Sequence, residues 1–579
     1  ELEAREPLVV ADFQALSGDS TLAVVVTEGL RADLAQSSFV TVADRGRVRE
    51  TLDRMLRPPG TRLDPGTARE VALRMGLKAV VEGEIGRAGT GYLLTARVVT
   101  ADSAVTLAAF RETAVDSTGL LAAIEGLSRS LRERVGESLG AVRASAPLAR
   151  VTTPSLPALR RFAEGSAEEQ AGNRSRAIRL LDDAVDLDPG FATAWHSLAI
   201  LHYNSNAREA TLRAMERALE HQDRLDDPRR HRARAFYAAI TGDHRAAELE
   251  ERELLTLTPD DPVPHINLSD MAWNRGDWAE AEGHARRALE LGSESWVAHW
   301  NLVVALLDAG KVEDARWAAE EARRTLPGDL DIQRQLIDMS LAAGSRYDSI
   351  RRHAATPPVR RAHAGRVLGR WDEAEALLRS SADAGGQARW WRYWDRMVVM
   401  GDPDATDAIE EAIDTVIGVV EDFPERPIAE VALAMAMAGR PDAARKARVR
   451  YEERVPEPVR WADAYLLHAI DGFLALDEGR LEDAFSALRR SRESTPWTAP
   501  VDAFVGRAYD LAGRPDSAIA AYERYLHTPW AYRIGFFHSF ADPVLLVPVH
   551  ERLAYLYEEL GDRTAAAGHA PAVLTLWDG

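Results

Sequence analysis

Two short stretches of the sequence contain residue types that can bind a ligand. The stretch GRAGTG at 86–91 has the glycine spacing of a phosphate-binding loop, in which backbone N–H groups surround a phosphate. It lies between two strand-like runs instead of opening a helix, which favours a β-hairpin. The stretch DPDATD at 402–407 has acids at calcium-like spacing but lacks the glycine and the terminal glutamate of a calcium loop. We interpret it as the start of a helix.

Signatures of catalysis are missing from the sequence. There is no cysteine, and the 15 histidines include no H-E-x-x-H motif. No nucleophile elbow and no catalytic triad pattern stands out. The basic stretch RRHRAR at 229–234 has acidic surroundings and is typical of a solvated helix face. We therefore predict a non-enzymatic protein with no metal and no cofactor; an enzyme hidden in the amino-terminal part is the disfavoured alternative.

Aromatic and amide side chains suited to holding a peptide recur along the chain. Trp and Tyr bury a large area at low entropic cost, and Asn can pair with a peptide backbone. We expect the partner-binding residues to be His196, Tyr203, Asn204, Asp270, Trp273, Asn274, Trp300 and Asp308. The alternative is that these tryptophans only pack helix against helix.

The elements that would position these residues come from an internal repeat. A glycine recurs in the same local phrase, and in most copies an alanine follows five residues later. Gly242, Gly276, Gly310 and Gly344 are each 34 residues apart. A glycine of this kind ends one helix in a left-handed conformation, and the alanine lets a second, antiparallel helix approach closely. The sequence therefore predicts a series of helical hairpins.

The repeat resembles the tetratricopeptide repeat, whose 34-residue pattern runs Trp-x-x-Leu-Gly-x-x-Tyr, then Ala, then Pro. Trp195 and Leu198, and later Tyr509 and Tyr557, carry this resemblance. It implies a superhelical solenoid over 156–579, with about 11–12 helical hairpins and a degenerate stretch near 345–425. In that register, the eight residues above face the concave groove formed by the first helix of each hairpin.

Residues 1–145 lack this period and predict a small α/β domain with the order βαβααβββα, ending in one long helix over 117–143. The stretch 146–155, rich in Pro, Thr and Ser, is the expected linker. The fold class is thus a small amino-terminal α/β domain followed by a large all-α solenoid, predominantly helical.

The amino-terminal part resembles the amino-terminal domain of TolB and its relatives. The opening F-x-x-L-S-G-D at 13–19 and the phrase A-x-x-x-G-L-K-A-V-V-E-G at 72–83 carry this resemblance. A TolB-like domain followed by tetratricopeptide repeats resembles the extracytoplasmic half of bacterial membrane-bound serine/threonine kinases and cyclases, as does the closing stretch 549–577. Kinase activity is not implied, because the Gly-rich loop and the HRD and DFG motifs are absent from this sequence.

The net charge and the hydropathy of the sequence limit which classes of partner and which location are expected. A net charge of −20 argues against nucleic acid and anionic lipid as partners, and it favours a protein or peptide with a basic or polar face. No run approaches the ~20 apolar residues of a membrane helix. By the resemblance, we expect an extracytoplasmic, periplasmic protein, membrane-anchored through a segment outside this sequence. It would be either the sensor ectodomain of a transmembrane kinase or cyclase or an accessory scaffold on a large membrane complex.

Overall fold

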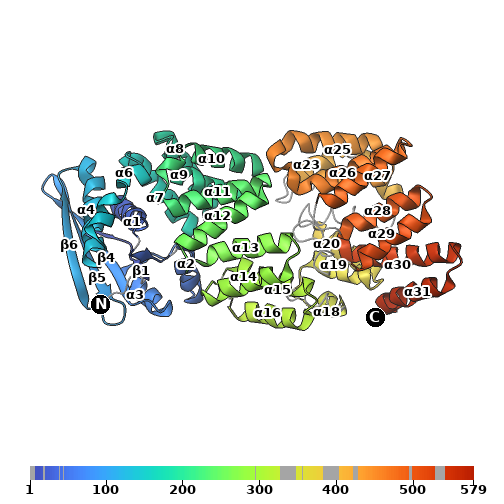
Figure 1. Ribbon diagram of the computed structural model, residues 1–579, viewed down its shortest axis with the longest axis horizontal. Coiled ribbons are helices and arrows are strands. Elements are labelled where there is room, and N and C mark those ends of the chain that lie inside the picture. Colours follow the sequence, from blue (N-terminus) through green and yellow to red (C-terminus); the bar gives the residue numbers. More distant parts are fainter. Residues whose placement is uncertain are drawn as a thin grey trace. The chain divides into compact units, whose positions relative to one another are not determined.

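The structure is a computed structural model, and it divides the chain into two compact units, Glu1–Asp260 and Asp261–Gly579 (Figure 1). It describes the following residues: 7–16, 20–37, 39–43, 45–205, 207–293, 295–325, 347–354, 356–382, 403–411, 413–421, 428–494, 499–527 and 541–578.

The first unit begins with a mixed sheet of six strands among the residues described. The strands are β1 (Pro7–Val10), β2 (Gln14–Ala15), β3 (Thr41–Val42), β4 (Ala79–Ala88), β5 (Gly91–Thr100) and β6 (Thr106–Ala114). Their order is β3-β1-β4-β5-β6, with β2 paired to β4. β1 runs parallel to β3 and β4, whereas β4, β5 and β6 are antiparallel.

The glycine-rich stretch at 86–91 is a β-hairpin, as predicted. Ala88 pairs with Gly91 at the end of the β4–β5 ladder, and Gly89 takes the positive φ of 64° that the tight turn needs. No helix starts at this turn, so the backbone N–H groups do not form a phosphate-binding cradle.

Two layers of helices cover the sheet because its strands alternate apolar residues between the two faces. Leu8, Val10 and Val81 share a core with α1 (Ser20–Leu34) and α4 (Leu120–Arg134). Val9, Val80 and Val99 share a second core with α2 (Arg45–Arg54) and α3 (Pro65–Arg74). This is the α/β domain that the sequence predicts.

The single helix predicted over 117–143 is wrong, because the structure divides this stretch. A 3-10 turn (Ser117–Gly119) precedes α4, and α5 (Leu139–Ala144) follows it after a break at Gly136, whose φ is 99°. Arg132 donates two hydrogen bonds of 2.8 Å to the Glu137 carboxylate, and both side chains are 2% exposed. This buried ion pair holds the corner between the two helices.

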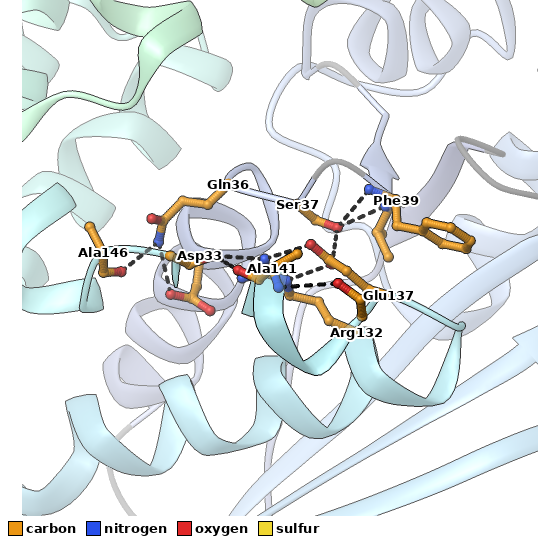
Figure 2. Close-up of polar contacts among 11 residues, drawn as sticks. Asp33, Gln36, Ser37, Phe39, Arg132, Glu137, Ala141 and Ala146 are labelled. Atoms are coloured by element: carbon orange, nitrogen blue, oxygen red, sulfur yellow. Dashed lines mark hydrogen bonds and ion pairs between the residues drawn. The ribbon is translucent and has the colours of Figure 1, made fainter. Parts of the chain in front are cut away.

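Neighbouring groups complete the hydrogen bonding at that corner (Figure 2). Ser37 donates to Glu137 at 2.5 Å, and a third bond from Arg132 reaches the Ser145 hydroxyl at 2.7 Å. Gln36 joins α1 to the chain after α5, because its amide donates to Asp33 and to the Ala146 carbonyl, each at 3.1 Å. Burial raises the pKa of Asp33 to about 6.

The predicted linker, 146–155, is packed against both of its neighbours. It contains the short helix α6 (Leu148–Val151), and Leu148, Val151 and Thr153 are buried. Helix α1 also contacts α7 (Leu156–Gln170), since Val25 lies in the core that the first repeats form. The α/β domain and the first hairpins therefore form one compact unit.

After α7, the described residues are mainly helical. In the first unit the remaining helices are α8 (Arg174–Leu187), α9 (Ala192–Tyr203), α10 (Arg208–Glu220), α11 (Asp227–Thr241) and α12 (His244–Leu257). The second unit begins with α13 (Pro262–Asn274), α14 (Trp278–Glu290), α15 (Trp296–Asp308), α16 (Val312–Thr325), α18 (Tyr347–Arg352), α19 (Pro358–Val367) and α20 (Trp371–Ala382). It continues with α22 (Pro403–Glu411), α23 (Ile413–Glu421), α24 (Ile428–Met437), α25 (Pro441–Arg454), α26 (Ala464–Asp477), α27 (Leu481–Glu493), α28 (Ala499–Leu511), α29 (Pro515–His527), α30 (Ala541–Glu559) and α31 (Arg563–Asp578).

Consecutive helices form hairpins for the reason that the sequence suggests. Gly242 and Gly276 end their helices with φ near 80°, and the aspartate after each one caps the next helix. Asp243 accepts a hydrogen bond from the Ala246 N–H, and Asp277 accepts one from Glu280, each at 3.0 Å. A Gly-Asp pair is thus enough to stop one helix and start the next.

The degenerate stretch predicted near 345–425 is described only in part. It contains α18, α19, α20, α22 and α23, while residues 345–346, 355, 383–402, 412 and 422–427 lie outside the described residues. The DPDATD stretch straddles one of these limits, and α22 begins within it at Pro403.

Candidate partner-binding surface

Three of the expected partner-binding residues lie on α9 or at its end, and two of them contact an aromatic residue of α11. The Phe236 ring meets the His196 ring edge-on at 6.5 Å and the Tyr203 ring edge-on at 5.2 Å, measured between centroids. Tyr203 is 56% exposed, and Asn204, which ends α9, is also exposed. We refer to His196, Tyr203, Asn204 and Phe236 as the α9–α11 face.

Two cationic side chains of α11 lie close to the histidine of this face. Burial, followed by the charges of the nearby Arg232 and Arg229 guanidinium groups, lowers the pKa of His196 to about 4. His196 is therefore neutral at pH 7. Arg229 pairs with Asp226 at 2.9 Å, one turn earlier on the same helix. The Asp226 carboxylate, which caps α11, therefore balances part of the positive charge of Arg229.

The α/β domain contributes a cation close to the same helices. Arg45, the first residue of α2, pairs with Glu28 of α1. Burial lowers the pKa of Arg45 to about 10, while the charges of Asp12 and Glu169 raise it and that of Arg229 lowers it. Glu169 belongs to α7 and Arg229 to α11, so Arg45 lies within electrostatic range of both array helices.

The expected residues Asp270 and Asn274 lie one turn apart on α13, and we refer to them as the α13 patch. The Asn274 amide donates to the Asp270 backbone carbonyl at 2.9 Å and to its carboxylate at 3.1 Å. Asp270 is exposed to water, yet the protein around it desolvates the carboxylate enough to raise its pKa to about 6. The Asp270 carboxylate is therefore exposed, whereas the half-buried Asn274 amide is bonded to it.

The other three expected residues are buried between helices. The Trp273 indole N–H of α13 donates to the Asp308 carboxylate of α15 at 2.6 Å, and the two residues are 5% and 8% exposed. Trp300 is 4% exposed and meets Trp296 edge-on at 6.2 Å. The Trp273–Asp308 bond joins two helices, and Trp300 belongs to the same hydrophobic cluster as Trp273. These three residues therefore stabilise the array and do not belong to its exposed surface.

Phe236, whose ring contacts both His196 and Tyr203, was not predicted from the sequence. Phe236 precedes Gly242 by the same six residues that separate Asp270 from Gly276. Applying the repeat register to 227–241 would therefore have found it. No sequence signal marks Arg45, since its place beside α7 and α11 depends on how α2 packs.

Neither a metal cluster nor a membrane span occurs in the described part of the chain. Within it, no three His, Cys, Asp or Glu side chains are placed to share a metal ion. No helix in the same ranges is long and apolar enough to cross a membrane.

The hairpins match a known repeat family. Residues 162–210 and 267–329 match the family model described as tetratricopeptide repeat, and these two segments include Tyr203, Asn204, Asp270 and Asn274. Two segments of the helical part of the chain, behind the amino-terminal α/β domain, are therefore similar to tetratricopeptide repeats.

Among solved structures, the chain is similar to part of the APC/C hetero-tetramer Cut9–Hcn1, with 13% identity over 79% of this chain and 83% of that one and a TM-score of 0.35. It is also similar to PilW, described as a widely conserved type IV pilus biogenesis factor, with 15% identity over 41% and 98% and a TM-score of 0.30. The carboxy-terminal domain of LpoB from Salmonella enterica is 16% identical over 20% and 84%, with a TM-score of 0.18. No curated protein matches the sequence.

Proposed function

We propose that this chain is a non-catalytic protein-interaction module that holds a polypeptide partner on the first helices of its repeat hairpins. The observation that carries the proposal is the α9–α11 face, where an exposed tyrosine and an exposed asparagine stand beside a supporting phenylalanine. A rigid aromatic ring with an adjacent amide is well suited to anchoring a peptide.

The local charges favour an acidic or polar segment at this face. Arg229 and Arg232 lie beside His196, and Arg45 is close to Arg229, although the chain as a whole carries a net charge of −20. A segment with carboxylates would therefore be attracted here even though the rest of the array repels it.

A co-purification experiment with two variants tests this function. The chain is purified in gentle detergent from its own cells as wild type, as Tyr203→Ala and as Trp317→Ala; the α16 residue Trp317 is 63% exposed and serves as the matched control. We expect Tyr203→Ala to reduce the yield of the co-purifying protein at least tenfold and Trp317→Ala to leave it unchanged. Equal yields from all three would argue against binding at the α9–α11 face.

We further propose that the protein acts outside the cytoplasmic membrane, on the basis of its resemblance to the extracytoplasmic half of membrane-bound kinases. The same preparation distinguishes the two roles that fit this location. An intact mass far above 63.7 kDa with kinase or cyclase peptides supports a sensor ectodomain. A mass near that value, with membrane subunits eluting stoichiometrically, supports an accessory scaffold.

A further inference from the structure

Two hairpins of the second unit carry a histidine on each helix, with the two rings in direct contact. His265 of α13 and His284 of α14 bring their Nδ1 atoms within 2.8 Å, and His550 of α30 and His569 of α31 bring theirs within 3.0 Å. In both pairs the residues are 19 positions apart, so the contact occupies the same place in its hairpin. None of the four residues belongs to the α9–α11 face or the α13 patch.

A carboxylate lies behind the second histidine of each pair. His284 Nε2 is 3.7 Å from Glu280 Oε1, and His569 Nε2 is 3.2 Å from Glu523 Oε1. A carboxylate near Nε2 favours the tautomer in which the second histidine carries its proton on Nε2. The Nδ1 lone pair of that histidine is then directed at the other ring. Carboxylates placed in this way also orient the histidines that bind metals in other proteins.

We infer that each histidine pair is a binding site for one divalent late-transition cation, of which Zn²⁺ is the probe. The cation would take the place of the proton that the two Nδ1 atoms share, and the proton on the first histidine would move to its own Nε2. Tetrahedral zinc with Zn–N bonds of 2.0–2.1 Å needs the two nitrogens about 3.4 Å apart. The rings therefore have to separate by roughly half an ångström, which a small side-chain rotation provides.

Water would complete the coordination, since only two protein ligands meet at each site. The side chains of His284 and His569 are 17% and 13% exposed, so each pair is reached from solvent. Two imidazoles suit zinc, copper and nickel better than magnesium or calcium.

A third hairpin has a related pair at the same place. His231 of α11 contacts Glu250 of α12 through Nδ1 at 2.5 Å, again 19 residues apart. This pair carries one imidazole and one carboxylate, so its hydrogen bond is charge-assisted when the histidine is protonated. It is a natural comparison for the two histidine pairs, and we expect it to bind zinc more weakly.

Calorimetric titration of the full-length chain with Zn²⁺ tests the inference. The variants are His284→Asn, His569→Asn and the double variant, and His244→Asn is the control because its side chain is exposed on α12 and it belongs to neither pair. We expect each single variant to lose one equivalent of bound zinc, the double variant to lose two and the control to lose none. Unchanged stoichiometry in the double variant would overturn the inference.

A second measurement does not depend on how the variants fold. In the wild type, electron paramagnetic resonance of bound Cu²⁺ should show hyperfine coupling to two imidazole nitrogens per ion. If every bound Cu²⁺ ion showed coupling to only one nitrogen, or to none, the result would contradict the inferred pairs.

Discussion

The buried Arg132–Glu137 pair is the residue-scale feature with the largest expected energetic effect. Both side chains are 2% exposed, so truncating one leaves the other charge buried without its partner. We predict that Glu137→Ala lowers the free energy of unfolding by about 3–5 kcal/mol. Urea denaturation followed by circular dichroism measures the change.

The matched control is an exposed ion pair in the same unit. Arg213 and Glu209 are 70% and 71% exposed and 3.6 Å apart on α10. Glu209→Ala should therefore change the free energy of unfolding by less than about 0.5 kcal/mol. Similar losses in the two variants would mean that burial does not decide the strength of the Arg132–Glu137 pair.

His196 makes the stability of the first unit depend on pH. Its pKa is about 4 in the folded chain and near 6.5 in the unfolded chain, so between these values the unfolded state binds the additional proton. Stability is therefore lost as the pH falls from 6.5 towards 4. We predict that the thermal midpoint of His196→Gln falls less than that of the wild type between pH 7 and pH 4.5. Parallel curves for the two proteins would contradict this assignment.

The repeat register could place residues on a helix, but it could not decide which of them stay exposed. It identified Tyr203 and Asp270 correctly as belonging to the first helices of their hairpins, and both are exposed. It also predicted that Trp273 and Trp300 face the groove, although their indole rings are buried. Exposure depends on the neighbouring helices, as the bond from Trp273 of α13 to Asp308 of α15 shows, and spacing within one repeat does not specify such contacts.

At the scale of the elements, the turn glycines and the glycines inside helices have opposite roles. Gly310 ends α15 with a φ of 73°, and a Cβ there would meet no atom within 4 Å. The cost of Gly310→Ala is thus backbone strain alone, and we predict a loss of about 1–2 kcal/mol in the free energy of unfolding.

Gly283 provides the internal control for that prediction. It lies inside α14, where a Cβ would also meet no atom within 4 Å, but its φ is not positive. Gly283→Ala should stabilise the chain by about 0.5–1 kcal/mol. Thermal or urea unfolding of the two variants measures both effects, and a stabilising Gly310→Ala would contradict the role assigned to the turn glycines.

The order of helices and strands could be predicted because periodicity and turn residues are local signals. The hairpins after Gly242 and Gly276 follow from such signals alone, and so does the order βαβααβββα, which lacks only the two-residue strand β2. The break between α4 and α5 could not be predicted in this way, because it depends on a salt bridge across the corner and on contacts with Ser37. For the same reason, the helix α6 within 146–155 has no clear sequence signal.

At the scale of the whole molecule, the division at Asp260 leads to a prediction about fragments. The hydrophobic clusters of the α/β domain and of α7–α11 lie wholly within the first unit, and none of the described clusters crosses the division. We predict that a fragment of residues 1–260 folds and unfolds cooperatively. A fragment ending at residue 145 should be less stable, because it exposes Val25, which packs on α7.

Circular dichroism and urea unfolding of the two fragments measure this difference. A fragment of residues 1–145 that is as stable as residues 1–260 would show that the contact between α1 and α7 adds little.

The central claim is that the α9–α11 face holds a polypeptide partner, and site-specific photo-crosslinking tests it most directly. A photoreactive phenylalanine analogue replaces Tyr203 in one sample and Trp317 in another, two positions that are 56% and 63% exposed. Both proteins are irradiated in their own cells, and the products are identified by mass spectrometry. If the α9–α11 face holds a polypeptide partner, we expect one dominant protein adduct from position 203 and none from position 317. Equal labelling from the two positions, or none from position 203, would contradict it.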